Sequence, residues 1–181
     1  LVMIVTFIAT LAMPVHYAVF LGVALSLMLF VYRSSTDIEI TEIIHDEERG
    51  WFEQAAPDQL PSHAVTNLEI YGSVFFASAH TLESLLPSAE GSDRAAVVLR
   101  LRGRQDIGST FVLVLERYAE RLQRNNGKLI LAGVSQPVMD QIERTETTEA
   151  IPNEDIFLAS DHLGQSVNMA HAAATAWVDE G

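Results

Sequence analysis

The distribution of charge along the chain constrains its fold more than any other feature. Residues 1–35 contain no acidic residue and a single basic one, Arg33, and are almost entirely apolar. Residues 36–181 hold all 24 acidic residues and 10 of the 11 basic ones, a net charge of −14. One core cannot bury both kinds of segment. We therefore predict two domains, with residues 1–35 as the end of a transmembrane domain and residues 36–181 as a separate α/β domain.

The apolar N-terminal part predicts a hairpin of two membrane helices, the first truncated. Residues 15–32 are long enough to cross a bilayer core of roughly 30 Å at about 1.5 Å per residue. Residues 1–13 are too short to span alone, and Pro14 and His16 lie at the expected turn. Arg33 favours a cytoplasmic location for the domain on its C-terminal side. Small residues that suit close helix packing are Ala18, Gly22, Ala24 and Ser26. A buried hairpin of a soluble protein is the alternative, and a signal peptide is disfavoured because no basic residue precedes the run.

Residues 95–134 form the central unit of the second part. Residues 97–101 read as a buried strand and residues 129–132 as another, which predicts parallel strands with a right-handed crossover. Between them lies an amphipathic helix, for which Gly108 or Ser109 is the expected cap. Gly127 is the expected left-handed residue at its end. The apolar positions of this helix recur every three or four residues: Phe111, Leu115, Tyr118, Ala119 and Leu122.

The other expected elements complete one α/β domain. Strands are expected at residues 36–44, 65–71 and 73–76, and residues 156–159 are expected as a short strand or extended segment. Helices are expected at residues 77–86, from Pro137 to about residue 145, and at residues 163–178. Residues 46–62 read as a loop because they combine acidic residues with glycine and proline. Trp51 and Phe52 are expected to hold that loop against the domain.

Several classes of site and partner are excluded by composition. The chain has no cysteine, so it has no disulfide, thiolate nucleophile or Cys-ligated zinc. The six histidines are scattered and none has the spacing of a metal site. No glycine-rich phosphate-binding motif occurs, and the acidic balance opposes nucleic-acid binding. We predict a protein that is not an enzyme, with no cofactor, metal or nucleic-acid partner.

Four segments together resemble the STAS domain, a module shared by sulfate transporters and anti-sigma-factor antagonists. They are LEIYGSVFFASAHTLESLL at 68–86, VVLRLRG at 97–103, IGST at 107–110 and GKLILAGV at 127–134. Upstream, GVALSLMLFVYRSS at 22–35 resembles the last transmembrane helix of SulP-family anion transporters. The resemblance implies a STAS-like mixed β-sheet with helices packed on it, following the membrane hairpin.

The resemblance also points to a candidate regulatory loop, Ile107, Gly108, Ser109 and Thr110. Family members commonly have Asp-Ser-Ser/Thr-Gly here, with a phosphorylated second hydroxyl in the antagonists. In this chain Gly108 takes the Asp position and Phe111 the Gly position, while Asp106 lies two residues earlier. Thr110 at a helix N-terminus is a candidate for phosphate. The alternative is that Ser109 and Thr110 only cap the helix.

The implied function is regulation of a proton- or sodium-coupled secondary anion transporter of the sulfate, bicarbonate or dicarboxylate type. We expect the inner (cytoplasmic) membrane as its location, with the STAS domain in the cytoplasm. The implied partners are the transporter's own membrane domain, a second copy in a homodimer, and a regulatory protein. The alternative is a membrane-tethered signalling module, similar to anti-sigma-factor antagonists, that binds a switch kinase.

Overall fold

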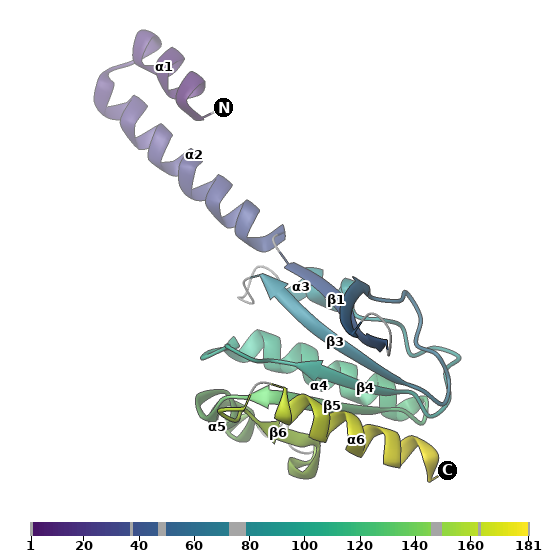
Figure 1. Ribbon diagram of the computed structural model, residues 1–181. Helices are drawn as coiled ribbons and strands as arrows, with labels where there is room; N and C mark the ends of the chain where they lie inside the picture. The colour runs from purple at the N-terminus through teal and green to yellow at the C-terminus, as the bar shows by residue number, and fades with distance from the viewer. Residues whose placement is uncertain are drawn as a thin grey trace.

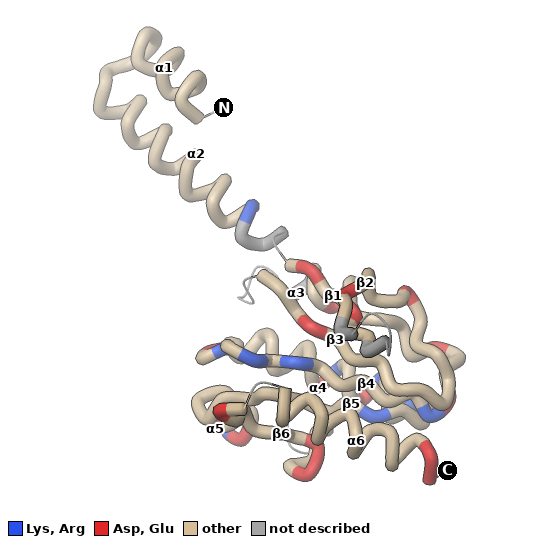
Figure 2. Tube along the Cα trace, viewed as in Figure 1, with Lys and Arg blue, Asp and Glu red and all other residues tan. Residues whose placement is uncertain are grey.

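Two apolar helices project from an α/β domain (Figure 1). The computed structural model describes residues 2–36, 38–46, 50–72, 79–145, 150–162 and 164–180. Helix α1 covers Val2–Ala12 and helix α2 covers Val15–Thr36, with Pro14 at the turn between them as predicted. The segment Val15–Arg33 is long and apolar enough to cross a membrane, whereas α1 is shorter. Arg33 is the basic residue of the last turn of α2 (Figure 2).

Small side chains form the contact between α1 and α2. Ala9, Ala18 and Gly22 are buried there, and a Cβ atom on Gly22 would lie 2.9 Å from the Thr6 hydroxyl oxygen. The packing role predicted for Ala18 and Gly22 is therefore correct, whereas Ala24 and Ser26, predicted with them, are exposed. Large apolar side chains cover the outer surface of both helices: Met3, Phe7, Leu11, Phe20, Leu27, Met28 and Phe30 are all exposed. Such a surface is typical of helices that face lipid or other helices.

In the part of the chain that the structure describes, six strands form one mixed sheet. Their spatial order is β2 (Gly50–Ala55), β1 (Ile38–Asp46), β3 (Val65–Gly72), β4 (Ala96–Arg100), β5 (Lys128–Val134) and β6 (Ile156–Leu158). Strand β1 pairs antiparallel with both β2 and β3, while β3, β4, β5 and β6 run parallel. The predicted α/β class, the parallel central pair and the short strand at 156–158 are confirmed.

Strand β2 corrects the sequence prediction, which placed a loop over residues 46–62. Gly50–Ala55 is an edge strand that pairs along β1, from Asp46 with Gly50 to Thr41 with Ala55. The acidic and glycine residues around position 50 favour a turn by their local sequence, and only pairing with β1 makes Gly50–Ala55 a strand. The strand predicted at 73–76 lies outside the described residues.

Helices α3 (Ala79–Leu85), α4 (Gly108–Arg124) and α5 (Gln136–Arg144) cover one face of the sheet, and α6 (Gln165–Asp179) covers the other (Figure 1). Alternate strand residues point to alternate faces, so Val97 and Leu99 pack toward α4 while Ala96 and Val98 pack toward α6. The helix predicted between the central strands is confirmed, and all five of its predicted apolar positions are buried: Phe111, Leu115, Tyr118, Ala119 and Leu122.

The end of α4 differs from the prediction in one detail. Asn126, with φ of 53°, takes the left-handed conformation, and not Gly127. Glycine is still required at 127, because a Cβ atom there would lie 2.8 Å from the carbonyl oxygen of Ala95. Side-chain size, and not backbone handedness, thus selects Gly127.

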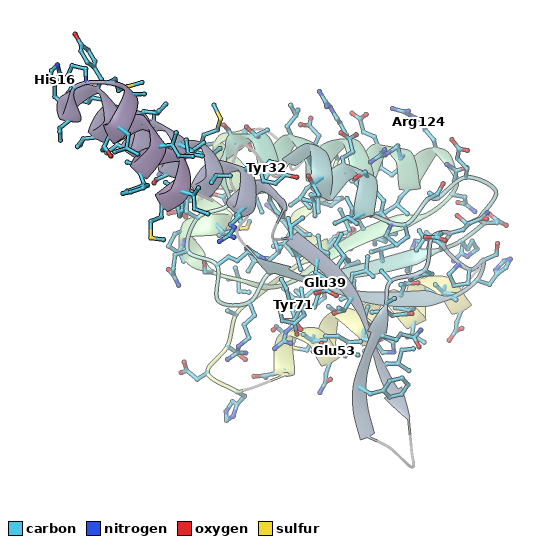
Figure 3. All side chains as sticks on the ribbon, turned by 90° about the horizontal axis from the view of Figure 1, so that it is seen from above. His16, Tyr32, Glu39, Glu53, Tyr71 and Arg124 are labelled. Carbon is cyan, nitrogen blue, oxygen red and sulfur yellow. The ribbon has the colours of Figure 1, made fainter. Side chains whose placement is uncertain are left out.

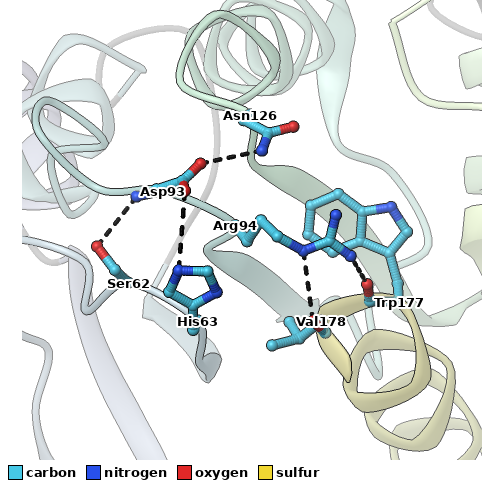
Figure 4. Close-up of polar contacts among 7 residues, drawn as sticks. All are labelled: Ser62, His63, Asp93, Arg94, Asn126, Trp177 and Val178. Carbon is cyan, nitrogen blue, oxygen red and sulfur yellow. Dashed lines mark hydrogen bonds and ion pairs between the residues drawn. The ribbon is translucent and has the colours of Figure 1, made fainter. Parts of the chain in front are cut away.

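The C-terminal end of α6 is held by the loop that precedes β4 (Figure 4). The Arg94 guanidinium donates hydrogen bonds to the carbonyl oxygens of Trp177 and Val178, and it lies 4.6 Å from the centre of the Trp177 ring. Asp93 next to it accepts a hydrogen bond from Asn126 and lies 3.7 Å from the His63 imidazole. A cation at the last carbonyls of a helix stabilises that helix end.

Candidate functional site

The predicted regulatory loop follows β4 and is fastened to the neighbouring strand by Arg104. A turn at Gly103 brings the Arg104 guanidinium to the end of β3, where it donates to the carbonyl oxygens of Ile70 at 2.7 Å and Gly72 at 3.3 Å. The Arg104 carbonyl in turn accepts a hydrogen bond of 2.8 Å from the Ser135 hydroxyl. Burial lowers the pKa of Arg104 from its ordinary value, but an arginine remains charged at neutral pH.

Gln141 of α5 fixes the middle of the loop with both ends of its amide. Its oxygen accepts the Ile107 N–H at 3.1 Å, and its nitrogen donates to the Asp106 carboxylate at 2.7 Å. The same carboxylate oxygen accepts the Gly108 N–H at 2.9 Å. Both bonds lower the pKa of Asp106, and the bond from the Gly108 N–H has the larger effect. The Ile107 side chain is fully buried and anchors the loop in the core.

Helix α4 begins differently from the prediction. Ile107 is the cap residue and Gly108, with φ of 64°, is the first helical residue, so neither Gly108 nor Ser109 is the cap. The side chain that accepts a backbone N–H at this end belongs to Asp106. The alternative reading of Ser109 and Thr110 as capping residues is therefore wrong, because the loop already supplies a carboxylate two residues before the helix.

Ser109 and Thr110 both border a shallow hollow of about 270 Å³ on the surface of α4. Ser109 is exposed and Thr110 half-buried, and Glu116 one and a half turns later lines the same hollow. The four predicted site residues are consecutive, with the Ile107 side chain inside the core and the Ser109 and Thr110 side chains at the hollow. Free hydroxyls in the first turn of a 17-residue helix are groups that a kinase can modify.

A second site was missed by the sequence analysis. A pocket of about 400 Å³ lies on the α6 side of the sheet, where within the described residues α6 packs less on the outer strands β1 and β2. Its lining residues, which we call the acidic pocket, are Ile43, Phe52, Glu53, Glu69, Tyr71, Arg100, Gly164, Val167 and Asn168. Phe52 and Glu53 belong to β2, so the prediction of a loop over residues 46–62 hid this site. Residues 52–55, Phe-Glu-Gln-Ala, do not alternate between polar and apolar, so the local sequence gives no period-2 signal for this strand.

Hydrogen bonds order the polar side of the acidic pocket. The Tyr71 hydroxyl donates to the Glu53 carboxylate at 2.6 Å, and Arg100 pairs with Glu69 at 2.5 Å on the adjacent strand. The bond to Glu53 is the main cause that raises the pKa of Tyr71 to about 12. Glu69 is therefore compensated by Arg100, whereas the charge of Glu53 has only a neutral hydroxyl as its partner among the described residues.

No group of three or more acidic or histidine side chains within the described ranges is arranged to hold a metal ion. In the acidic pocket the Tyr71 hydroxyl lies against the Glu53 carboxylate, but its pKa is raised to about 12, which disfavours the ionised, nucleophilic form. The chemistry that these two sites offer is modification of a hydroxyl and recognition of a charged group.

Comparison with known proteins identifies the domain. The STAS domain model matches residues 58–163, more than half of the chain. The candidate sulfate transporter YvdB of Bacillus subtilis (strain 168) is 28% identical over 156 residues, which is 86% of this chain and 28% of that protein. The chain therefore spans less than a third of the length of this relative.

Solved structures show the same fold. The murine Solute Carrier 26 family member A9 anion transporter in the inward-facing state matches with a TM-score of 0.69 at 15% identity, over 94% of this chain and 28% of that one. A structure of SLC26A9 matches with a TM-score of 0.68 at 14% identity, over 96% of this chain and 30% of that one. A sulfate transporter family protein from Wolinella succinogenes matches with a TM-score of 0.52 at 28% identity, over 66% of this chain and 91% of that one.

Proposed function

The chain belongs to the STAS domain family, and from that membership we propose that it forms the C-terminal part of a SulP-type secondary anion transporter. One observation carries the proposal: the apolar helix α2 ends at Thr36 and β1 of the STAS domain begins at Ile38. A membrane helix joined so closely to this domain makes the domain part of a membrane protein. Residues 1–35 are then the end of the membrane domain, and residues 36–181 the cytoplasmic STAS domain.

The domain regulates transport through contacts with the membrane domain, and the loop at Ile107, Gly108, Ser109 and Thr110 is its switch. A hydrogen bond and a strand pairing link this loop to the start of β1, the strand that follows α2. Arg104 binds the end of β3 at Gly72, Gly72 is in register with Ile38, and Ile38 opens the strand that follows α2. A change in the loop can thereby shift the strand that leaves the membrane helix.

Phosphorylation of Thr110 would operate this switch electrostatically. A phosphate adds about 1.5 to 2 negative charges at neutral pH. Asp106 before the helix and Glu116 in the same hollow would oppose that charge, while the first N–H groups of α4 would attract it. A modified loop therefore differs in its preferred conformation from an unmodified one, and this difference biases the transporter between states.

The transported substrate is an inorganic or small organic anion of the sulfate, bicarbonate or dicarboxylate type, moved together with a proton or sodium ion. The transporter is a homodimer in the inner (cytoplasmic) membrane, and a regulatory protein reads the loop. The proteins to which the chain is similar are transporters and STAS domains, and we assign no catalytic activity to this one.

Anion uptake by the full-length protein tests this function. Labelled sulfate, bicarbonate and dicarboxylate uptake is measured in cells with and without residues 36–181, and with Thr110→Ala, Thr110→Glu and Arg104→Ala. We expect uptake by the full-length protein, an altered rate after deletion, opposite effects of the two Thr110 variants, and loss of the Thr110→Glu effect when Arg104 is replaced. Arg124→Ala, which removes an exposed ion pair with Glu120 at the far end of α4, is the matched control. Absence of uptake for every anion would reject the transporter and favour a tethered signalling module.

A further inference from the structure

We infer that the acidic pocket receives one lysine or arginine side chain from the cytoplasmic face of the transporter's own membrane domain. The inference rests on the proposed function, because it takes that membrane domain as the neighbour. Membership of the STAS domain family does not by itself specify this contact.

The position of the pocket favours a partner on the membrane side. Figure 3 views the molecule from the side where α2 leaves the domain, and Glu39, Tyr71 and Glu53 lie close together in this view. Tyr71 pairs in register with Glu39 on β1 and bonds to Glu53 on β2, so the three side chains are neighbours in the structure. Glu39 is only one residue from the start of β1, close to the end of α2.

The charge of the pocket selects a cation. Arg100 neutralises Glu69, but Glu53 is exposed, and the exposed Glu39 adds a second carboxylate at the rim. This charge repels anionic lipid headgroups and phosphate. The cytoplasmic loops of membrane proteins, in contrast, carry an excess of lysine and arginine. The net charge of −14 over residues 36–181 favours the same kind of neighbour.

The walls of the pocket suit the shape of a long basic side chain. Ile43 and Val167 form an apolar lining that can cover a methylene stem, while Glu53, paired in register with Ile43 and so on the same face, can accept hydrogen bonds from the charged head. The ring of Tyr71, which is 40% exposed, offers a π face to the same cation. A volume of about 400 Å³ leaves room for the side chain with its backbone.

A photo-crosslinker placed in the pocket of the full-length protein tests the inference. Ile43, which lines the pocket and pairs in register with Glu53, is replaced by p-benzoylphenylalanine, membranes are illuminated, and adducts are mapped by mass spectrometry. We expect an adduct with a lysine- or arginine-bearing peptide from a cytoplasmic loop of the membrane domain. Glu53→Gln should lower its yield about two- to fivefold, as for an exposed ion pair, and added salt should lower it further.

Two variants control for charge and position. Glu90→Gln removes an exposed carboxylate at the far end of the domain and should leave the yield unchanged, while Glu53→Asp should retain most of it. Adducts only with lipid or with another protein, no adduct, or a yield indifferent to Glu53→Gln would overturn the inference. Anion uptake is measured on the same membranes: an adduct without transport rejects the proposed function alone, and transport without an adduct rejects the docking alone.

Discussion

The two faces of the sheet are built from the same strands but differ in what covers them. On one face α3, α4 and α5 close a continuous apolar core, in which Leu99, Leu115 and Leu122 are fully buried. On the other face α6 alone packs on β4 and β5 through small and β-branched residues such as Ala170 and Val98. Within the described residues α6 packs less on the outer strands β1 and β2, and the acidic pocket lies between them and the start of α6.

The α4 face of the sheet mainly stabilises the fold, while the α6 face carries the acidic pocket. The α4 face supplies most of the buried apolar area, which is the main favourable term in folding. The α6 face has less of that burial and leaves polar side chains of β2 and β3, Glu53 and Tyr71, exposed. Substitutions in α4, at the end of α6 and in the loop before α4 should therefore have different effects on stability.

The sharpest contrast is expected from truncation of a leucine in α4. Leu115→Ala should lower the free energy of unfolding by about 2–5 kcal/mol, because it leaves a cavity in the closed core. Leu113→Ala on the same helix should change it by no more than about 0.5 kcal/mol, since Leu113 is 42% exposed. Denaturant unfolding of the full chain in detergent, followed by tryptophan fluorescence, measures both. Equal losses would mean that the α4 face is not the dominant core.

A smaller effect, confined to the other face, is expected from Arg94. Arg94→Ala removes the donors to the last carbonyls of α6 and the stacking on Trp177, at a cost of about 1–3 kcal/mol. Hydrogen exchange should rise in α6 and stay unchanged in α4. Arg124→Ala is the control, because its pair with Glu120 is exposed and contributes little. Loss of protection in α4 as well would show that the two faces unfold together.

The least disruptive test concerns the loop at the edge of the α4 face. The pKa of Asp106 is lower in the folded chain than its ordinary value of 3.8, so its bonds stabilise the loop above that pH and are lost as the pH falls through the folded pKa. Gln141→Ala should raise this pKa only part of the way back, because the larger contribution comes from the Gly108 N–H. A carboxyl-carbon NMR titration, assigned with Asp106→Asn, measures it. An unchanged pKa would show that the Gln141 amide does not stabilise the Asp106 carboxylate.

Much of the fold could be predicted from local pattern. The spacing of apolar residues in α4, the short apolar runs of β4 and β5, and Pro137 in the first turn of α5 each determine an element within a few residues of sequence. Strand β2 could not be predicted, since its hydrogen bonds run to β1 and its acidic and glycine residues locally favour a turn. The four loop residues were proposed through the family resemblance, while the bonds from Arg104 and Gln141 were not predicted.

The sequence by itself determined the division of the chain into an apolar helical part and an acidic α/β part, because charge segregation and hydrophobic periodicity are properties of neighbouring residues. Only the tertiary structure decided that Gln141 holds Asp106 and Ile107, that Asn126 is left-handed beside Gly127, and that Glu53 meets Tyr71. These features join residues that are distant in sequence or depend on the space left by a neighbour. Contacts of that kind are set by packing, which no local pattern encodes.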